Sequence, residues 1–391
     1  MRTDIFTFAS PTELILEIPL ETYNQALLVS ESLSNPFTRH QAYINKLCLD
    51  AVLPWLQEEF TDQTKPFLDD TALLNLWEFL NGTAINLADG SRVILVPSET
   101  IDNDELRVAQ EWIDIPEFAG DYYLAVQVLA EDNCVKINGY SHHTHFLDRG
   151  RYDASDRTYS VDNRHVITDI SALIVARELC PQETTRSVIQ PIVNISLQQA
   201  QNLIERLSNP QIIIPRLEIP FQMWAGLISH GGWRNKLYQR RLNIPEPKSV
   251  VDWLQNGITQ IAQLGGWESF NLDFSTAGAR SVEQQNVPIT GFSRILNIAG
   301  QFYELRVLPQ PHEQDNTWKF ELRNATPGGI IPGGVKLKLL SEDLQPFPDN
   351  EDIAIAASEQ IFVTVVLEPG EGIVWEIEPL PENYDREILK F

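Results

Sequence analysis

Cysteine is scarce in this sequence: Cys48, Cys134 and Cys180 are the three that occur, and they lie far apart along 391 residues. They form no Cys-x-x-Cys pair and their number is odd, so the pattern excludes a disulfide scaffold and favours reduced thiols. The first residues, MRTDIFTFASPTELILEI, lack the unbroken apolar stretch of a secretory signal peptide. We therefore expect a cytoplasmic protein.

Long hydrophobic runs and positive charge are also in short supply. No window approaches the roughly 18 uncharged apolar residues that a membrane-spanning helix needs, so no membrane span is predicted. The chain has 29 Lys and Arg against 54 Asp and Glu, which gives a formal charge of -25. That charge repels phosphate groups, so general nucleic-acid binding and attraction to anionic lipid are disfavoured.

Signatures of known catalysis are missing as well. There is no HExxH, no GxGxxG that follows a strand and no Gly-Lys-[Ser/Thr] phosphate loop. The run Gly139-Tyr140-Ser141-His142-His143 lacks the second glycine that a nucleophile elbow needs for its sharp turn. We therefore expect no enzymatic activity and no cofactor.

The sequence does contain enough apolar material for more than one domain, with 43% hydrophobic residues and nine Trp. Asn35 followed by Pro36 predicts a helix start, because the Asn side chain can accept the free amide hydrogens of the first turn. Pro54 is expected to kink or restart that helix. A later helix is predicted from Ser249 to a left-handed cap at Gly265-Gly266.

A two-residue period predicts strands between these helices, at 92–97, 106–113, 121–130 and 134–140. Their tight connections, including a hairpin turn at Glu131-Asp132-Asn133, suggest a small antiparallel sheet. Helical patterns then return up to about residue 265. The first 275 residues therefore read as one α+β domain.

The last hundred residues have almost no helical pattern. Strands are predicted at 289–298, 301–308, 317–323, 335–340, 353–357, 361–367, 373–378 and 385–391. Their regular spacing and the Pro- and Gly-rich turns between them favour a β-sandwich. We predict an α+β protein with an α+β domain at 1–275, a linker at 276–287 and an all-β sandwich at 288–391.

A histidine cluster is the candidate metal site. On a strand, His143 and His145 would share a face, with His142 and Asp148 nearby, as a two-histidine site requires. The sequence fixes neither a third ligand nor the groups that would hydrogen-bond the ligands. A solvated loop is the alternative, and we predict no metal.

A dense mixed-charge patch follows. Arg149, Arg151 and Arg157 alternate with Asp148, Asp153 and Asp156. Guanidinium groups suit an anion or a partner's carboxylate, so the arginines could bind a phosphate. They could equally latch the loop through internal ion pairs, and we favour the latch because the acids balance the bases.

One cationic run occurs in this acidic chain, at residues 233–241. Its basic and aromatic residues, Trp233, Arg234, Lys236, Arg240 and Arg241, form the candidate partner-binding surface. Because the chain repels nucleic acid, an acidic protein surface is the preferred partner. A solvated helix face that balances the chain's own acids is the alternative.

The central motifs are similar to those of an uncharacterised cyanobacterial protein family, a domain of unknown function. They are Gly139-Tyr140-Ser141, then Arg149-Gly150-Arg151-Tyr152-Asp153, then Arg157-Thr158-Tyr159 ahead of a helix that ends in Leu179-Cys180. The resemblance covers roughly the first 270 residues, and the β part resembles a module that ends many members. It assigns no catalytic residue. It implies a regulatory setting, because members are often encoded near sigma factors and caspase-like signalling proteins.

The leading hypothesis is a non-catalytic interaction or regulatory protein of a cytoplasmic signalling assembly, which binds another protein through the sandwich loops, exposed strand edges or the 233–241 run. A metal-dependent hydrolase built on His142 to His145 is one alternative. A sigma-factor or nucleic-acid-associated regulator is the other.

Overall fold

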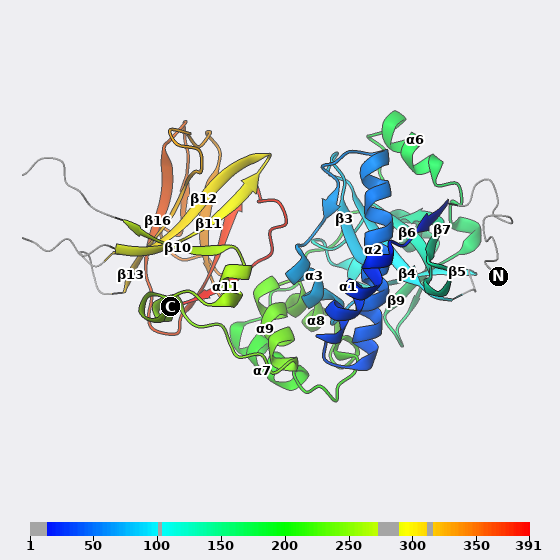
Figure 1. The fold of residues 1–391 in the computed structure, drawn as a ribbon, viewed down its shortest axis with the longest axis horizontal. Coiled ribbons are helices and arrows are strands. Elements are labelled where there is room, and N and C mark those ends of the chain that lie inside the picture. Colours follow the sequence, from blue (N-terminus) through cyan, green and yellow to red (C-terminus); the bar gives the residue numbers. More distant parts are fainter. Residues whose placement is uncertain (1–13, 101–103, 273–288, 311–315) are drawn as a thin grey trace, which may run out of the picture. The chain divides into compact units, whose positions relative to one another are not determined.

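The computed structural model describes residues 14–100, 104–272, 289–310 and 316–391 (Figure 1). Contacts divide the chain into two compact units, Met1–Ile244 and Pro245–Phe391. The first unit combines helices with a mixed sheet, and antiparallel sheets make up most of the second. The predicted α+β class is confirmed.

A six-stranded sheet forms the centre of the first unit, in the order β1-β7-β6-β4-β3-β2. Its strands are β1 (Leu14–Glu17), β2 (Lys65–Pro66), β3 (Thr83–Asn86), β4 (Arg92–Ser98), β6 (Tyr122–Leu129) and β7 (Cys134–His142). β4 and β6 run parallel, whereas their other neighbours pair antiparallel. Parallel neighbours need a long crossover, which the chain makes between residues 99 and 121.

The predicted strand at 106–113 does not join this sheet. β5 (Glu105–Ala109) pairs with β9 (Thr158–Asp162), which pairs with β8 (Arg151–Asp153), in a separate antiparallel sheet. The expectation of one small antiparallel sheet from four successive strands is therefore wrong. Alternation identifies a strand, but it does not identify the strand's neighbour or their relative direction.

The longest helix of the first unit starts where the sequence predicts. α2 (Pro36–Glu59) has a capping box in which the Asn35 side chain accepts from the backbone of Thr38 and the Thr38 side chain accepts from that of Asn35. The helix continues through Pro54, which is exposed, so the missing hydrogen bond lies on the solvent side. Among the described residues, no helix is both long and apolar enough to cross a membrane.

α2 packs against β4, β6 and β7 of the sheet, and eight further α-helices belong to the described part of the first unit. The α-helices are α1 (Leu20–Glu31), α3 (Asp70–Trp77), α4 (Glu111–Asp114), α5 (His143–Asp148), α6 (Ser171–Leu179), α7 (Leu197–Leu207), α8 (Phe221–Ile228) and α9 (Gly231–Arg241). The 3-10 turns are η2 (Ala130–Asp132), η3 (Asn163–His165) and η4 (Pro215–Leu217). α1 packs along α2, and α9 contacts α3, α7 and α8.

Two antiparallel sheets form the second unit, as the β-sandwich prediction requires. One sheet has the order β10-β11-β12-β13-β16 and the other β15-β14-β17-β18. The strands are β10 (Trp267–Leu272), β11 (Ile289–Ile298), β12 (Gln301–Pro309), β13 (Thr317–Asn324), β14 (Lys336–Ser341), β15 (Glu351–Ile353), β16 (Gln360–Val366), β17 (Gly372–Glu378) and β18 (Ile388–Lys390). Every strand predicted between 289 and 391 overlaps one of these.

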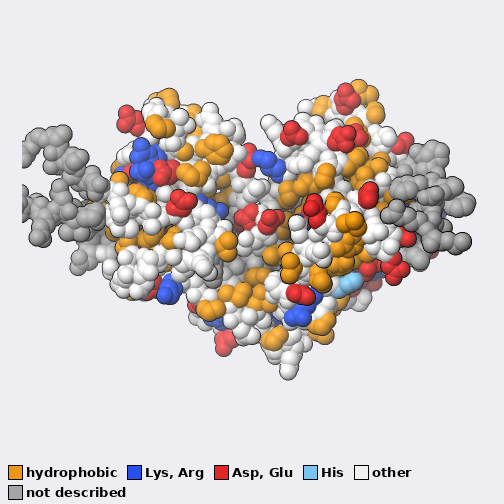
Figure 2. Space-filling view, in the orientation of Figure 1, with side chains coloured by type: hydrophobic (Ala, Val, Ile, Leu, Met, Phe, Trp, Pro, Cys, Tyr) orange, Lys and Arg blue, Asp and Glu red, His pale blue; other side chains and the backbone are white. Residues whose placement is uncertain are grey.

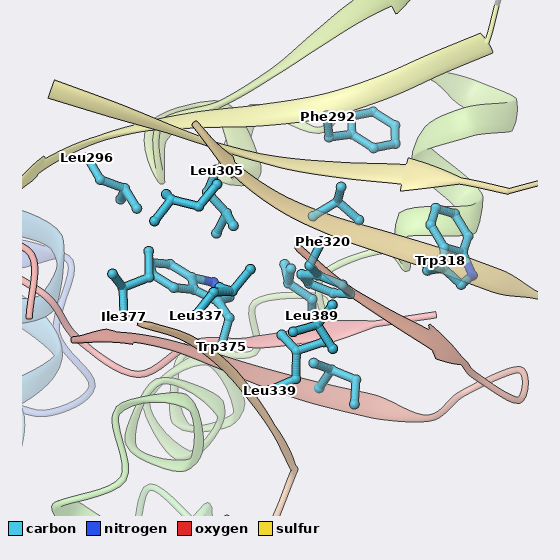
Figure 3. Packing of buried hydrophobic residues seen from close by; sticks show 14 of the residues in the cluster. Phe292, Leu296, Leu305, Trp318, Phe320, Leu337, Leu339, Trp375, Ile377 and Leu389 are labelled. Atoms are coloured by element: carbon cyan, nitrogen blue, oxygen red, sulfur yellow. The ribbon is translucent and has the colours of Figure 1, made fainter. Parts of the chain in front are cut away.

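Side chains from the two sheets meet in one apolar core. In Figure 3, Phe292, Leu305 and Phe320 of the larger sheet lie opposite Leu337 and Trp375 of the smaller sheet. All five are almost fully buried. Burying one such side chain contributes about 1.5 to 3 kcal/mol before the entropy of ordering it is subtracted, so this core holds the unit together.

The second unit begins earlier than the predicted domain boundary near residue 275. α10 (Val250–Asn256) supplies Trp253 to the core of this unit, and β10 supplies Trp267 and pairs with β11. The helix predicted from Ser249 onward breaks at Gly257, whose φ of 82° ends α10 before α11 (Gln260–Leu264). The predicted linker at 276–287 lies outside the described residues.

The unit division predicts different stabilities for two fragments. A fragment of residues 245–391 keeps Trp253 and Trp267, whereas one of residues 288–391 loses both, and removing a buried Trp side chain costs about 3 to 5 kcal/mol. We expect the longer fragment to unfold cooperatively in urea and the shorter one at a clearly lower midpoint. Equal midpoints would place the boundary where the sequence predicted it.

Candidate functional site

The structure does not assemble the predicted histidine site. His142 ends β7 and His143 begins α5, so His143 and His145 lie on a helix, where residues two apart do not face each other. His143 is buried, and both ring nitrogens are engaged. Nε2 donates to the Ile113 carbonyl at 2.9 Å, and Nδ1 accepts from the Ser187 amide at 3.3 Å. Asp148 is exposed.

His142 and His145 serve packing instead. Their rings stack with centroids 4.9 Å apart, and His145 Nδ1 lies 3.2 Å from Ser141 Oγ. Among the described residues, no group of three or more His, Cys, Asp and Glu side chains could hold a metal ion. This geometry gives the metal-dependent hydrolase alternative no support.

Of the three arginines in the mixed-charge patch, Arg157 acts as a latch. Its guanidinium donates to the main-chain carbonyls of Arg216 and Ile219. Arg149 is exposed, and Arg151 is also exposed, 3.7 Å from Glu105. The predicted partners were wrong, because the latch closes on carbonyl oxygens rather than on the neighbouring acids.

Arg216, whose carbonyl accepts from Arg157, also forms a buried ion pair. Arg216 binds Glu111 through two hydrogen bonds, Nε to Oε1 at 2.8 Å and Nη2 to Oε2 at 2.6 Å. The Trp224 indole also donates to Glu111 Oε1, at 2.7 Å. The Glu111 side chain is fully buried and Arg216 nearly so. This network ties α4, η4 and α8 together, and its charges are satisfied internally.

The predicted partner-binding run is mostly inside the first unit, which corrects that interpretation. Trp233, Arg234 and Arg241 are 3%, 1% and 2% exposed. Lys236 is half-buried, and Arg240 is exposed. Because α3, α7 and α8 cover α9, most of this run has no access to a partner.

Arg241 instead joins four segments. Its Nε donates to Glu78 Oε1 at 2.7 Å, and both side chains are fully buried. Its Nη1 donates to the Leu207 carbonyl at 2.9 Å, and its Nη2 to Ser34 Oγ at 3.1 Å and to the Ile212 carbonyl at 3.0 Å. Glu78 also accepts from the backbone and hydroxyl of Ser34, which lies between α1 and α2. This pair therefore fixes the turn from which α1 and α2 extend.

α1 has its apolar residues on the outside, and sequence reasoning missed this feature. It buries Thr22, Ala26 and Ser30, at four-residue spacing. On the opposite side Leu20 and Leu28 are 74% and 71% exposed. Leu27, also exposed, lies beside them. We call Leu20, Leu27 and Leu28 the α1 face.

Close packing explains the small residues on the inner side. Thr22, Ala26 and Ser30 let α1 approach α2 closely, and α2 presents its own small residues Thr38 and Ala42 as buried positions. Leucines there would hold the two helices further apart. The inner side therefore specifies the position of the helix, and the leucines outside it contribute little to holding it there.

Two acidic residues of α1 lie beside the α1 face. α1 contains Glu21 and Glu31, both exposed, and no Lys or Arg. Figure 2 shows mainly hydrophobic and acidic side chains, with a few Lys or Arg and His side chains among them, over the part of the first unit where α1 and α2 lie. A surface of this kind is complementary to an apolar segment flanked by basic residues.

Leucine spacing is the signal that could have revealed this face. Leu20, Leu27 and Leu28 recur at seven and eight residues, as on one side of a helix. The sequence does not show which side of the helix faces the core, because leucines usually face it and in α1 they do not. In α1 the small side chains of Thr22, Ala26 and Ser30 are buried in their place.

These observations define an α+β protein whose first unit presents an exposed apolar helix. The chain belongs to the family described as "Protein of unknown function (DUF1822)", whose profile matches residues 16–390. The match spans both units, whereas the sequence motifs indicated mainly the first 270 residues. Comparison with curated proteins and with solved structures gave no significant match.

The buried pair predicts a large stability effect at Arg241. Replacement by Met leaves Glu78 as an unpaired buried charge, so we expect Arg241→Met to lower the free energy of unfolding by about 3 to 5 kcal/mol in urea titrations. Arg240→Met, one residue earlier on an exposed position, is the matched control, with an expected change within about 0.5 kcal/mol. Similar effects of the two substitutions would contradict the buried role.

The histidine cluster predicts loss of stability in mild acid. Burial lowers the pKa of His142, His143 and His145, so the unfolded chain takes up protons first. Stability is then complete above the unfolded value of about 6.5 and is lost as the pH falls through that value toward the lower folded values. Urea midpoints should fall from pH 7 to pH 5, and the fall should be smaller in His143→Gln. A midpoint that rises over this range would contradict the prediction.

Proposed function

We propose that this protein is a non-enzymatic, cytoplasmic regulatory protein that binds another protein through the α1 face. The observation that carries the proposal is the exposure of Leu20, Leu27 and Leu28 on a helix whose inner side is already packed against α2. Single exposed leucines are common on protein surfaces. Three on one side of a short helix, with Leu27 and Leu28 about two turns from Leu20, form a candidate interaction site.

The geometry favours a helical partner. A stripe of side chains at i, i+7 and i+8 can pack against the apolar side of a second helix, as in helix-in-groove recognition. The partner helix would place its own apolar residues against the leucines of the α1 face. Burying a large apolar side chain in such a contact contributes about 1.5 to 3 kcal/mol, so three leucines can be its energetic centre.

Charge selects the partner further. Glu21 and Glu31 lie beside the leucines, and the chain carries a formal charge of -25, so we propose a partner helix with Lys or Arg at its edges. A second copy of this chain would oppose like charges, which disfavours self-association. Caspase-like signalling proteins and sigma factors, the partners that the family resemblance implies, are the first candidates to screen for such a helix.

A charge inserted into the α1 face tests the proposal. Proteins captured from the source cells are identified, purified and titrated against the wild-type chain and a Leu20→Glu plus Leu28→Glu variant. The fold tolerates Glu at these exposed positions. In the complex the two glutamates would be buried in an apolar contact, so we expect affinity for the partner to fall at least about tenfold. Urea midpoints of the two proteins should agree.

A matched control distinguishes this face from general surface charge. Leu179→Glu, at another leucine that is 72% exposed in the first unit, should leave the affinity unchanged. Raising the salt concentration should weaken binding of the wild type, since the flanking acids contribute attraction. A partner that binds the α1-face variant and the wild type equally would refute the proposed surface.

A further inference from the structure

The first unit also contains a cavity of about 320 Å³, at the lower end of the range of about 300 to 1,000 Å³ that is typical of ligand pockets. We propose that it is a binding site for a small organic ammonium compound with an apolar body. This inference is independent of the α1 face, because none of the residues that line the cavity belongs to α1.

The walls of the cavity are mainly apolar. Ile113, Leu147 and Phe221 come from α4, α5 and α8. An extended segment, residues 188–193 with the sequence VIQPIV, completes the lining. This composition suits the hydrocarbon part of a ligand, and the small volume limits that part to one ring or a short branched chain.

The segment at 188–193 is held firmly on one side. The Thr185 carbonyl accepts from the Thr144 amide at 3.2 Å, the Thr185 hydroxyl donates to Asp121 at 3.1 Å, and the Ser187 amide donates to His143. Beyond it, Ile195 is buried again. The two ends of the segment are therefore held on either side of the cavity wall.

The middle of this segment has spare hydrogen-bond acceptors. Within the described part of the chain, the carbonyls of residues 188–192 accept no hydrogen bond, and Pro191 has no amide hydrogen to offer. Main-chain carbonyls of a cavity wall can each accept from an ammonium group or another donor. These carbonyls are left to water or to a ligand that enters the cavity.

Asp114 gives the cavity its charge. Its Oδ2 accepts from Gln110 Nε2 at 2.8 Å and from the Tyr159 hydroxyl at 3.1 Å, which orients the carboxylate. Its Oδ1 accepts no hydrogen bond from any described residue. Burial and then the Asp114 charge raise the pKa of Tyr159, so its hydroxyl remains a donor to that carboxylate. The second oxygen is left for a ligand.

Among the residues that the structure describes, no cation of the cavity lining neutralises Asp114. Of the described residues that line the cavity, none is Lys or Arg. His143 is neutral, because one ring nitrogen must donate to the Ile113 carbonyl and the other must accept from the Ser187 amide. The nearby cations are engaged elsewhere, Arg216 with Glu111 and Arg186 with Asp121. A cavity with one carboxylate and apolar walls favours an ammonium ligand over a neutral one.

The test uses two probes of equal shape and different charge. The intact protein is titrated with 2-phenylethylamine and with 2-phenylethanol by ligand-observed NMR. We expect the amine to bind at millimolar concentration and at least about tenfold more tightly than the alcohol. Failure of both probes to bind, or equal binding of the two, overturns the inference.

Two variants locate the binding. Asp114→Asn keeps the size of the side chain and removes its charge, so the preference for the amine should disappear, whereas Asp148→Asn, an exposed aspartate that does not line the cavity, should preserve it. Leu147→Lys adds a cation at an exposed position of the cavity wall. It should weaken binding of the amine and leave binding of the alcohol unchanged. A preference that survives both Asp114→Asn and Leu147→Lys overturns the site.

Discussion

The first unit depends on the Glu78–Arg241 ion pair. Arg241, at the end of α9, reaches Glu78 after α3, the carbonyl that ends α7 and the Ser34 turn between α1 and α2. Two charges out of water are costly unless every donor and acceptor is used, and here the guanidinium makes bonds through all three of its nitrogens. The pair sets the direction in which α1 leaves the turn. The residue that the sequence suggested as a contact for a partner therefore positions a different surface that we propose for that purpose.

Much of the fold follows from local sequence. The cap at Asn35 and the strands of the sandwich depend on side chains within a few residues of one another, so pattern alone identifies them. Pairing between distant strands does not. β5 leaves its neighbours for β9, and β4 lies parallel to β6, because the order of a sheet is decided by packing of the whole unit. For the same reason the helix pattern at 250–264 did not show which unit buries Trp253.

The candidate sites were harder to predict than the fold. The sequence does not distinguish a histidine that lines a cavity from one that binds a metal. His143 is distinguished only by its hydrogen bonds to the Ile113 carbonyl and the Ser187 amide, which engage both ring nitrogens. A cationic run likewise predicts charge but not burial, and Arg234 and Arg241 are inside. Asp114 has no distinguishing signal in a sequence with so many acidic residues. Its distinction is structural, because none of the described residues that line the cavity is Lys or Arg.

The burial of Glu78 and Arg241 also constrains how members of this family can diverge. A change at either position alone leaves a charge without its counterpart in an environment that water does not reach. Replacement of both by apolar side chains of similar volume removes that difficulty, so substitutions at the two sites should be inherited together. Positions 78 and 241, separated by most of the first unit in sequence, would then covary among relatives, and a lineage that has lost the pair would need another way to hold the Ser34 turn.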